Sequence, residues 1–517
     1  MKRSRAALSL GLSVALALTS CSTGSSDVTV DTPTTAGPAT PAGNESETGD
    51  GTEPLAQPEA TPTPSTPSPT ATPSIDAQPG AAGLGDPYYP TLGNGGYDVQ
   101  RYVLDLEWDP TNGMLDGVVT IEAIATQDLS AFNLELSGME VREITVDGAQ
   151  ASASREGIEL TVEPAEPVAD GTEFVTSIEY GGRPTQIDPL SDIGIGGWYV
   201  ENGMAFVLSE PAGNFAWHPV NDHPLDKAIF RVEMTAPPEL TVASAGLLME
   251  TVEEADGRRT WVYEARDPMA PYLLPLAIGD LELMSEDPVD GVPIRNAITA
   301  RLVDRADSFA RTPDMLRTFS ELFGPYPFEV YGVLVVDSTL GVALEQQTMS
   351  IFGQDWLQGG RNFDDVVAHE LAHQWFGNHV SVGEWDEIWL NEGFATYAQY
   401  LYFEAIDPNY DIDAEVNQLR QFDNRLLSLP VPGDPGPDQL FATSVYFRGA
   451  MTVHALRRTI GDEAFFETLR TYIERFGGGN ATTEDFQAIA EEIGGIDLDD
   501  FFQAWLYEAP LPPSPTG

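Results

Sequence analysis

The chain has few positive charges and almost no cysteine. It carries 25 Lys and Arg residues against 81 Asp and Glu residues, for a formal net charge of −56, and its only lysines are Lys2 and Lys227. This excess of negative charge argues against nucleic acid and anionic membrane surfaces as partners of the folded part. A hydrated surface suited to high salt would explain it, and so would the attraction of cationic peptides. Because Cys21 is the only cysteine, no disulfide can form within the chain.

Residues 1–20 have the pattern of an export signal. A basic start with Lys2 and Arg3 precedes an apolar stretch over 6–18, which is too short to span a bilayer as a permanent helix. Leu18-Thr19-Ser20-Cys21 follows and resembles a bacterial lipobox, which implies cleavage before Cys21 and lipid on its sulfur. The alternative is a plain secretory signal with an incidental cysteine. We expect an exported, cell-surface lipoprotein that contacts the membrane only through the lipid on Cys21.

Residues 21–85 predict a disordered linker. The segment consists almost wholly of Thr, Pro, Ser, Ala, Gly and acidic residues, as the sequence TPTPSTP over 61–67 illustrates. Such a composition cannot bury enough apolar surface to offset the entropy of ordering the chain. The linker would hold the folded part away from a lipid surface.

The remaining residues predict an α+β multidomain fold. Over 86–280 apolar and polar residues alternate, as in 102–106, 119–123 and 132–136, with turn residues between these segments. This pattern predicts an antiparallel, β-sandwich-like N-terminal domain. From 281 to 517 a few strands give way to helical periodicity, which predicts a mainly helical second domain.

The most informative segment is His369-Glu370-Leu371-Ala372-His373. On a helix, residues four apart lie one turn above each other, so His369 and His373 can both direct an imidazole nitrogen at one ion about 2 Å away. Glu370 lies about 100° round the helix and is better placed beside a water molecule than as a third ligand. Histidines outside this motif, such as His379 and His454, are expected to be surface or core residues and not metal ligands.

A third ligand, Glu392, follows His373 after eighteen intervening residues. Apolar spacing predicts a buried amphipathic helix over 389–406, which would pack beside the first helix and bring Glu392 to the same ion. Two histidines and one carboxylate leave one coordination position open, which is typical of catalytic zinc. The sequence therefore predicts one Zn²⁺ per chain, with Glu370 as the general base that activates water.

This zinc pattern resembles that of the gluzincin peptidases, and three further segments resemble the aminopeptidase N family, which includes leukotriene hydrolase-type enzymes. Val342-Ala343-Leu344-Glu345-Gln346 is similar to the family's Gly-x-Met-Glu-Asn motif, although Val, Leu and Gln replace three of its residues. Tyr446-Phe447-Arg448-Gly449-Ala450 is similar to its Tyr-Glu-Lys-Gly-Ala segment. Glu210-Pro211, followed by residues 218–224, resembles a Gln or Glu ahead of a Phe-Pro-Cys-x-Asp-Glu-Pro element.

The resemblance implies roles for three more residues. Tyr446 would stabilise the oxyanion of the tetrahedral intermediate. Glu210 and Glu345 would bind the α-ammonium of a peptide with a free N-terminus, which would make the protein a zinc aminopeptidase. The second domain, 281–517, would be thermolysin-like, and the active site would lie between the two domains, with only Glu210 contributed by the first.

Two other functional classes stay open on the sequence. A zinc endopeptidase or another zinc hydrolase would use the same metal ligands but would accept substrates with a blocked N-terminus. A non-catalytic surface lipoprotein that binds peptides is the alternative that involves no enzyme, although the presence of both Glu370 and Tyr446 argues against it.

Overall fold

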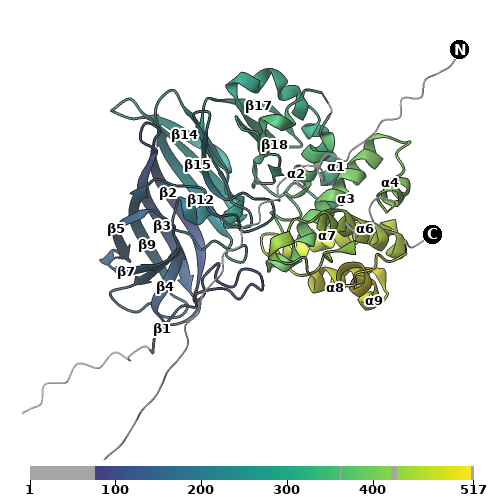
Figure 1. Ribbon diagram of the computed structural model, residues 1–517, viewed down its shortest axis with the longest axis horizontal. Helices are drawn as coiled ribbons and strands as arrows, with labels where there is room; N and C mark the ends of the chain where they lie inside the picture. Colours follow the sequence, from purple (N-terminus) through teal and green to yellow (C-terminus); the bar gives the residue numbers. More distant parts are fainter. Residues whose placement is uncertain (1–75, 361, 421–427, 514–517) are drawn as a thin grey trace, which may run out of the picture. The chain divides into compact units, whose positions relative to one another are not determined.

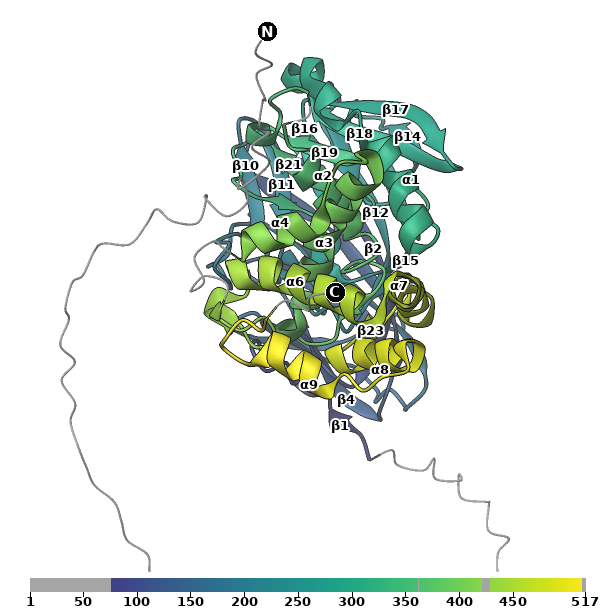
Figure 2. The same ribbon diagram turned by 90° about the vertical axis from the view of Figure 1, so that its right-hand side faces the viewer.

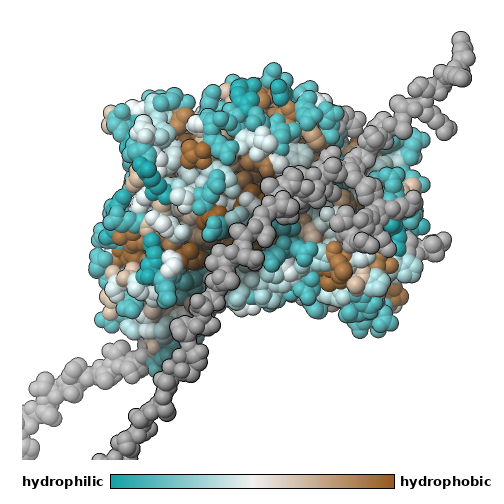
Figure 3. All heavy atoms as spheres, in the orientation of Figure 1, coloured by the Kyte–Doolittle hydropathy of each residue, from teal (hydrophilic) through white to brown (hydrophobic). Residues whose placement is uncertain are grey.

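The computed structural model describes residues 76–360, 362–420 and 428–513 (Figure 1). The predicted export signal, Cys21 and most of the predicted linker lie outside the described residues. The hydrophilic and apolar residues of the face drawn in Figure 3 are intermixed. None of the helices in the described part of the chain is both long and apolar enough to cross a membrane.

The predicted linker extends too far toward the C-terminus. Strand β1 (Gln78–Pro79) pairs in parallel with β4 (Leu129–Glu135), and the Gly80 N–H donates to the Ala131 carbonyl at 2.9 Å. These backbone hydrogen bonds need no apolar side chains, so a composition typical of disorder is still ordered at a sheet edge. Residues 76–85 therefore belong to the folded part.

Strands dominate the chain up to Gly279, in three sheets. An eight-stranded sheet has the order β14 (Leu247–Glu253), β15 (Arg259–Met269), β12 (Ala228–Ala236), β2 (Tyr97–Asp109), β3 (Met114–Ala125), β9 (Glu173–Gly182), β5 (Glu140–Val146) and β6 (Ala149–Gln150). A second sheet has the order β1, β4, β8 (Glu159–Glu163) and β7 (Ser152–Glu156). A third has the order β10 (Gly197–Glu201), β11 (Met204–Leu208), β16 (Leu276–Gly279) and β13 (Thr241–Ser244).

The prediction of an antiparallel domain is correct for most strand pairs but not for all. Central strands β2 and β12 pair in parallel, from Arg101 opposite Ile229 to Glu107 opposite Thr235, and β1 and β4 are also parallel. Alternation of buried and exposed side chains is the same in both orientations, so it carries no information about strand direction.

The second part begins with strands and continues as helices. Its sheet has the order β17 (Leu281–Val289), β18 (Val292–Thr299), β19 (Val333–Val336), β21 (Ser350–Gly353) and β20 (Ala343–Leu344). The helices are α1 (Thr312–Phe323), α2 (Asp364–Ala372), α3 (Trp389–Ile406), α4 (Ile412–Leu419), α6 (Thr443–Ile460), α7 (Asp462–Phe476), α8 (Thr483–Gly494) and α9 (Asp499–Phe502). The short strands β22 (Ser381–Val382) and β23 (Asn480–Ala481) pair with each other.

Helix α3 has the predicted bounds, 389–406, and lies in the middle of the helical part. It packs against α2, α4 and α6, as Figure 2 shows. Its residues are buried from Trp389 to Tyr402, on every side of the helix. One continuous apolar core extends from the eight-stranded sheet to these helices. The strand-rich and helical parts therefore form one packed unit.

Two ionisable side chains, the partly buried Lys227 and the buried Asp86, connect the strand-rich part to loops of the helical part. Lys227 donates from Nζ to the carbonyl oxygens of Asn378, His379 and Gly479 at 2.8, 3.1 and 3.2 Å. Asp86 accepts hydrogen bonds from the backbone N–H groups of Tyr88, Tyr89 and Trp385, each at 2.8 Å. Trp385 lies just before α3, so Asp86 fixes the approach of the chain to the helix that carries Glu392.

The electrostatic setting of Asp86 reflects these contacts. Its Oδ2 lies 3.4 Å from His223 Nε2, and both side chains are fully buried. Burial raises the pKa of Asp86, but His223 and the three N–H donors outweigh burial and hold the pKa below its ordinary value. The ionised form of Asp86 therefore stabilises the fold.

We expect Asp86→Ala to lower the free energy of unfolding by about 3 kcal/mol, because the substitution leaves buried N–H groups without an acceptor. Urea titration followed by tryptophan fluorescence measures the change. Asp170→Ala is the matched control, since the Asp170 side chain is exposed. Equal unfolding midpoints for the parent and Asp86→Ala would contradict this account.

The contribution of Asp86 to the free energy of unfolding also depends on pH. Because its pKa is lower in the folded state than in the unfolded state, the stabilisation is complete above the unfolded value of about 4. It is lost as the pH falls through the folded pKa. The difference in stability between the parent and Asp86→Ala should therefore shrink below about pH 4.

Candidate active site and metal centre

Helix α2 places the two histidines of the predicted metal site. His369 lies on its last turn and His373 is its C-terminal cap, and both side chains are buried. Their Nε2 atoms are 3.0 Å apart. His373 Nδ1 lies 3.0 Å from the Phe376 carbonyl oxygen, so Nδ1 carries the proton and Nε2 keeps its lone pair for a metal.

Helix α3 supplies the third ligand. Glu392 Oε2 lies 3.0 Å from His369 Nε2 and 3.5 Å from His373 Nε2. All three ligand atoms lie within 4.8 Å of one another. Two imidazole nitrogens and one carboxylate oxygen that meet in this way fit the donor set of a catalytic zinc ion.

The charges around the ligands favour a cation. Burial lowers the pKa of His369, which keeps its ring neutral and able to bind a metal. Burial also lowers the pKa of His373, but the carboxylates of Glu392 and Glu345 outweigh burial and raise the pKa to about 10. The negative charge of these carboxylates therefore favours a positive charge at the imidazoles, which a bound metal ion would supply.

Glu370 faces the same cleft from the turn of α2 that holds His369. Its side chain is 5% exposed. Burial raises the pKa of Glu370 well above its ordinary value, and the charges of Glu345 and Glu392 add to this effect. A carboxylate in such a setting has the raised affinity for a proton that a general base needs.

Tyr446 reaches the site because α3 and α6 approach very closely. A Cβ atom on Gly393 would lie 2.9 Å from the Gly449 Cα, and a Cβ on Gly449 would lie 2.8 Å from the Gly393 Cα. Only glycine fits at either position. This contact brings the Tyr446 ring to 5.9 Å from the His369 ring, with 21° between their planes.

Glu210 and Glu345 come from different sheets and meet near the metal ligands. Glu210 follows β11, Glu345 follows β20, and their side chains are 3% and 2% exposed. Within the described part of the chain, Oε1 of each carboxylate has no hydrogen-bond partner. Burial raises the pKa of Glu210 well above its ordinary value, and the charge of Glu345 raises it further. This pair is suited to bind a cationic group.

Neutral side chains hold Glu345 in place, and two of them, Gln374 and Asn378, belong to no motif found in the sequence. The Gln374 Nε2 and Asn378 Nδ2 groups each donate to the Glu345 carbonyl at 2.8 Å. Gln346 Nε2 donates to the Val207 carbonyl on β11 at 3.2 Å, which connects the Glu345 segment to the strand that precedes Glu210. Gln374 and Asn378 follow His373 closely in the sequence, which could have indicated a role near the metal site. Their amide side chains do not titrate, so they are not typical candidates for catalysis or metal binding.

One cleft brings together all seven residues predicted for the active site. Its lining includes Glu210, Glu345, His369, Glu370, His373, Glu392 and Tyr446. Glu210 comes from the strand-rich part and the other six come from the helical part. His379 and His454 are not among the residues that line this cleft, and His454 is buried between helices.

The match to known families covers both parts of the chain. Residues 98–273 match the family model of the Peptidase M1 N-terminal domain, and residues 308–505 match that of the Peptidase family M1 domain.

Curated relatives are longer than this chain. Aminopeptidase M1 of Arabidopsis thaliana is 29% identical over 342 residues, which are 61% of this chain and 38% of that protein. Aminopeptidase 2 of Candida albicans is 25% identical over 437 residues, which are 78% of this chain and 46% of that protein. The chain thus spans less than half the length of either relative.

Solved structures match over nearly their full length. The crystal structure of an M1 zinc metallopeptidase from Deinococcus radiodurans has a TM-score of 0.76 and 33% identity, and the match covers 84% of this chain and 99% of that one. A variant of that protein bound to a Tyr-Ser-Ala substrate gives a TM-score of 0.77 at the same identity and coverage. Because identity of this order extends over almost all of a solved member, this chain belongs to the M1 family of zinc metallopeptidases.

Proposed function

We propose that this protein is a zinc-dependent aminopeptidase that removes the N-terminal residue from peptides. The observation that carries the proposal is the pair Glu210 and Glu345, two buried carboxylates beside the metal ligands with unpartnered oxygen atoms in the described structure. A free α-ammonium is the part of a peptide that such a pair would bind. The related Deinococcus radiodurans variant with a bound Tyr-Ser-Ala substrate supports peptides as the substrate class.

The side chains of the cleft divide the chemistry between them. His369, His373 and Glu392 would hold zinc, which when bound would supply Lewis acidity toward the peptide carbonyl and toward water. Glu370 takes the proton of the attacking water and delivers it to the leaving nitrogen. Tyr446 donates a hydrogen bond to the oxyanion, which develops only in the transition state.

Glu210 and Glu345 determine which peptide bond of the substrate is cut. When the α-ammonium is bound by these two carboxylates, the first peptide bond lies next to His369 and His373. A peptide without a free ammonium leaves two buried carboxylates unpaired, which costs free energy. The pair thus measures one residue from the N-terminus.

We also propose that Cys21 carries lipid and anchors the protein at the cell surface. Support comes from the basic start, the short apolar stretch and the sequence Leu18-Thr19-Ser20-Cys21. The long linker after Cys21, up to about residue 75, would give the folded part access to peptides away from the membrane.

Glu370→Gln should lower kcat by about 10² to 10⁴, because it removes the proton acceptor while the metal ligands remain. Hydrolysis of an aminoacyl fluorogenic anilide measures the rate, and metal analysis measures zinc content. Glu239→Gln, on an exposed glutamate, is the control. A Glu370→Gln protein with bound zinc and full turnover would refute the role of Glu370.

N-acetylation of the same anilide should lower kcat/KM by at least about 100-fold, because the neutral amide cannot pair with Glu210 and Glu345. Glu345→Gln should reduce this discrimination. Comparable rates on blocked and free substrates would instead indicate an endopeptidase or another zinc hydrolase.

The lipid proposal predicts that the full chain, expressed in a bacterial host, incorporates labelled palmitate and sediments with membranes. Cys21→Ser should abolish both properties without changing the specific activity of the folded part, since Cys21 is separated from it by the linker. A parent protein that takes up no label would show that Cys21 belongs to a plain secretory signal.

A further inference from the structure

Beyond the metal ligands the cleft continues into a region with two carboxylates and three aromatic rings. We call this region the acidic branch, and its residues are Asp365, Tyr400, Phe403, Tyr410 and Glu415. Asp365 lies in the first turn of α2, Tyr400 and Phe403 lie on α3, Tyr410 lies in the loop that follows α3, and Glu415 lies on α4. None of these residues has a role in the chemistry described above.

The acidic branch lies at the opposite end of α2 from the ammonium-binding pair. Asp365, His369 and His373 are spaced four residues apart, so they follow one another at successive turns on one face. Glu345 is at the His373 end, because Gln374 and Asn378 hold its carbonyl and its charge acts on His373. A peptide that starts at Glu345 and crosses the metal ligands therefore extends its leaving part toward Asp365.

Both carboxylates of the branch are without a cationic partner in the described part of the chain. Among the described residues, no ion pair involves Asp365 or Glu415, and no Lys or Arg lines the cleft. Both side chains are half-buried, and burial raises the pKa of each above its ordinary value. A cation brought by the substrate would restore the lost solvation of these groups.

The aromatic rings suit a long side chain with a cationic end. The rings of Phe403 and Tyr410 are 5.8 Å apart, and Tyr400 is buried beside them. Burial raises the pKa of Tyr400, and the charges of Glu415 and Asp365 raise it further, which shows that both carboxylates act on this ring. The aliphatic stem of Lys or Arg packs well on such rings while its charged end meets the carboxylates.

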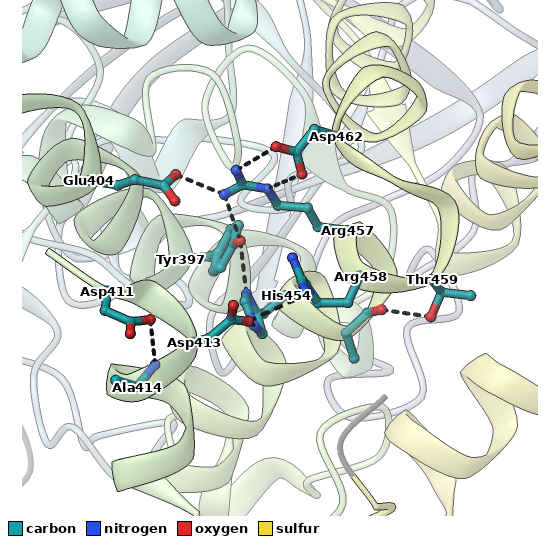
Figure 4. A network of polar contacts seen from close by, with 11 residues as sticks. Tyr397, Glu404, Asp411, Asp413, Ala414, His454, Arg457, Arg458, Thr459 and Asp462 are labelled. Atoms are coloured by element: carbon teal, nitrogen blue, oxygen red, sulfur yellow. Dashed lines mark hydrogen bonds and ion pairs between the residues drawn. The ribbon is translucent and has the colours of Figure 1, made fainter. Parts of the chain in front are cut away.

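A polar network holds α4, and with it Glu415, against α3 and α6 (Figure 4). Asp413, two residues before Glu415, lies 3.0 Å from His454 Nε2 and 3.5 Å from Arg458 Nε. The other ring nitrogen of His454, Nδ1, lies 3.1 Å from the Tyr397 hydroxyl on α3. These contacts fix the start of α4. Glu415 is therefore partly ordered before a ligand binds, and binding costs less conformational entropy.

We propose that the acidic branch selects peptides with Lys or Arg immediately after the scissile bond. This inference rests on the proposed aminopeptidase function and names its preferred substrates. One partly exposed charge pair favours such a residue by up to about fivefold.

The first test compares kcat/KM for Ala-Lys-Ala and Ala-norleucine-Ala, which share the side-chain stem and differ in the charge. The unaltered full chain should favour the lysine peptide by about fivefold at low salt, and the ratio should fall as the ionic strength rises. In the double variant Asp365→Asn, Glu415→Gln the ratio should approach one. Glu463→Gln removes an exposed charge of α7 and should leave the ratio as it is, which controls for the net charge.

A second test measures binding without turnover. The same two peptides are titrated calorimetrically into Glu370→Gln protein loaded with zinc, which should bind the lysine peptide more tightly by a similar factor. A ratio near one in the unaltered chain, or a ratio that neither salt nor the double variant changes, would overturn the inference even if hydrolysis is fast. Tighter, salt-sensitive binding of the lysine peptide, together with no hydrolysis of either peptide by the unaltered zinc-loaded chain, would support the acidic branch and would refute the aminopeptidase proposal.

Discussion

The approach of His369, His373 and Glu392 to a common point depends on how α2 packs against α3. The helix geometry of α2 brings its two histidines to one face, but the third ligand arrives only because α3 crosses beside it with Glu392 on the facing side. A small rotation of either helix would separate the nitrogen and oxygen atoms by more than a metal ion can bridge. The burial of α3 on every side opposes such a rotation.

Helix α3 serves several parts of the cleft at once. Glu392 contributes to the metal site, and Gly393 allows α6 to come close enough to place Tyr446 over His369. Two and three turns later, Tyr400 and Phe403 line the acidic branch. The metal site, the oxyanion site and the region that receives the leaving peptide therefore have fixed relative positions, which is a condition for stabilising a transition state.

The electrostatics of the cleft are dominated by buried carboxylates. Burial raises the pKa of Glu210, Glu345 and Glu370, and the charge of His373 opposes this effect at Glu345 and Glu370. Buried groups of one sign are costly unless cations balance them. A divalent ion and a substrate ammonium are cations that the proposed reaction supplies, so the fold is matched to its ligands in charge as well as in shape.

The sequence by itself determined the features that depend on local spacing. The His369 to His373 motif, Glu392 and the bounds of α3 follow from helical periodicity, and the resemblance to a known family pointed to Glu210, Glu345 and Tyr446. Tertiary structure alone decided the parallel pairing of β2 with β12 and the ordered conformation of residues 76–85. It also decided the acidic branch, whose residues come from three helices and a loop. These features depend on contacts between segments far apart in the chain, and a one-dimensional pattern of polarity does not specify which segments meet.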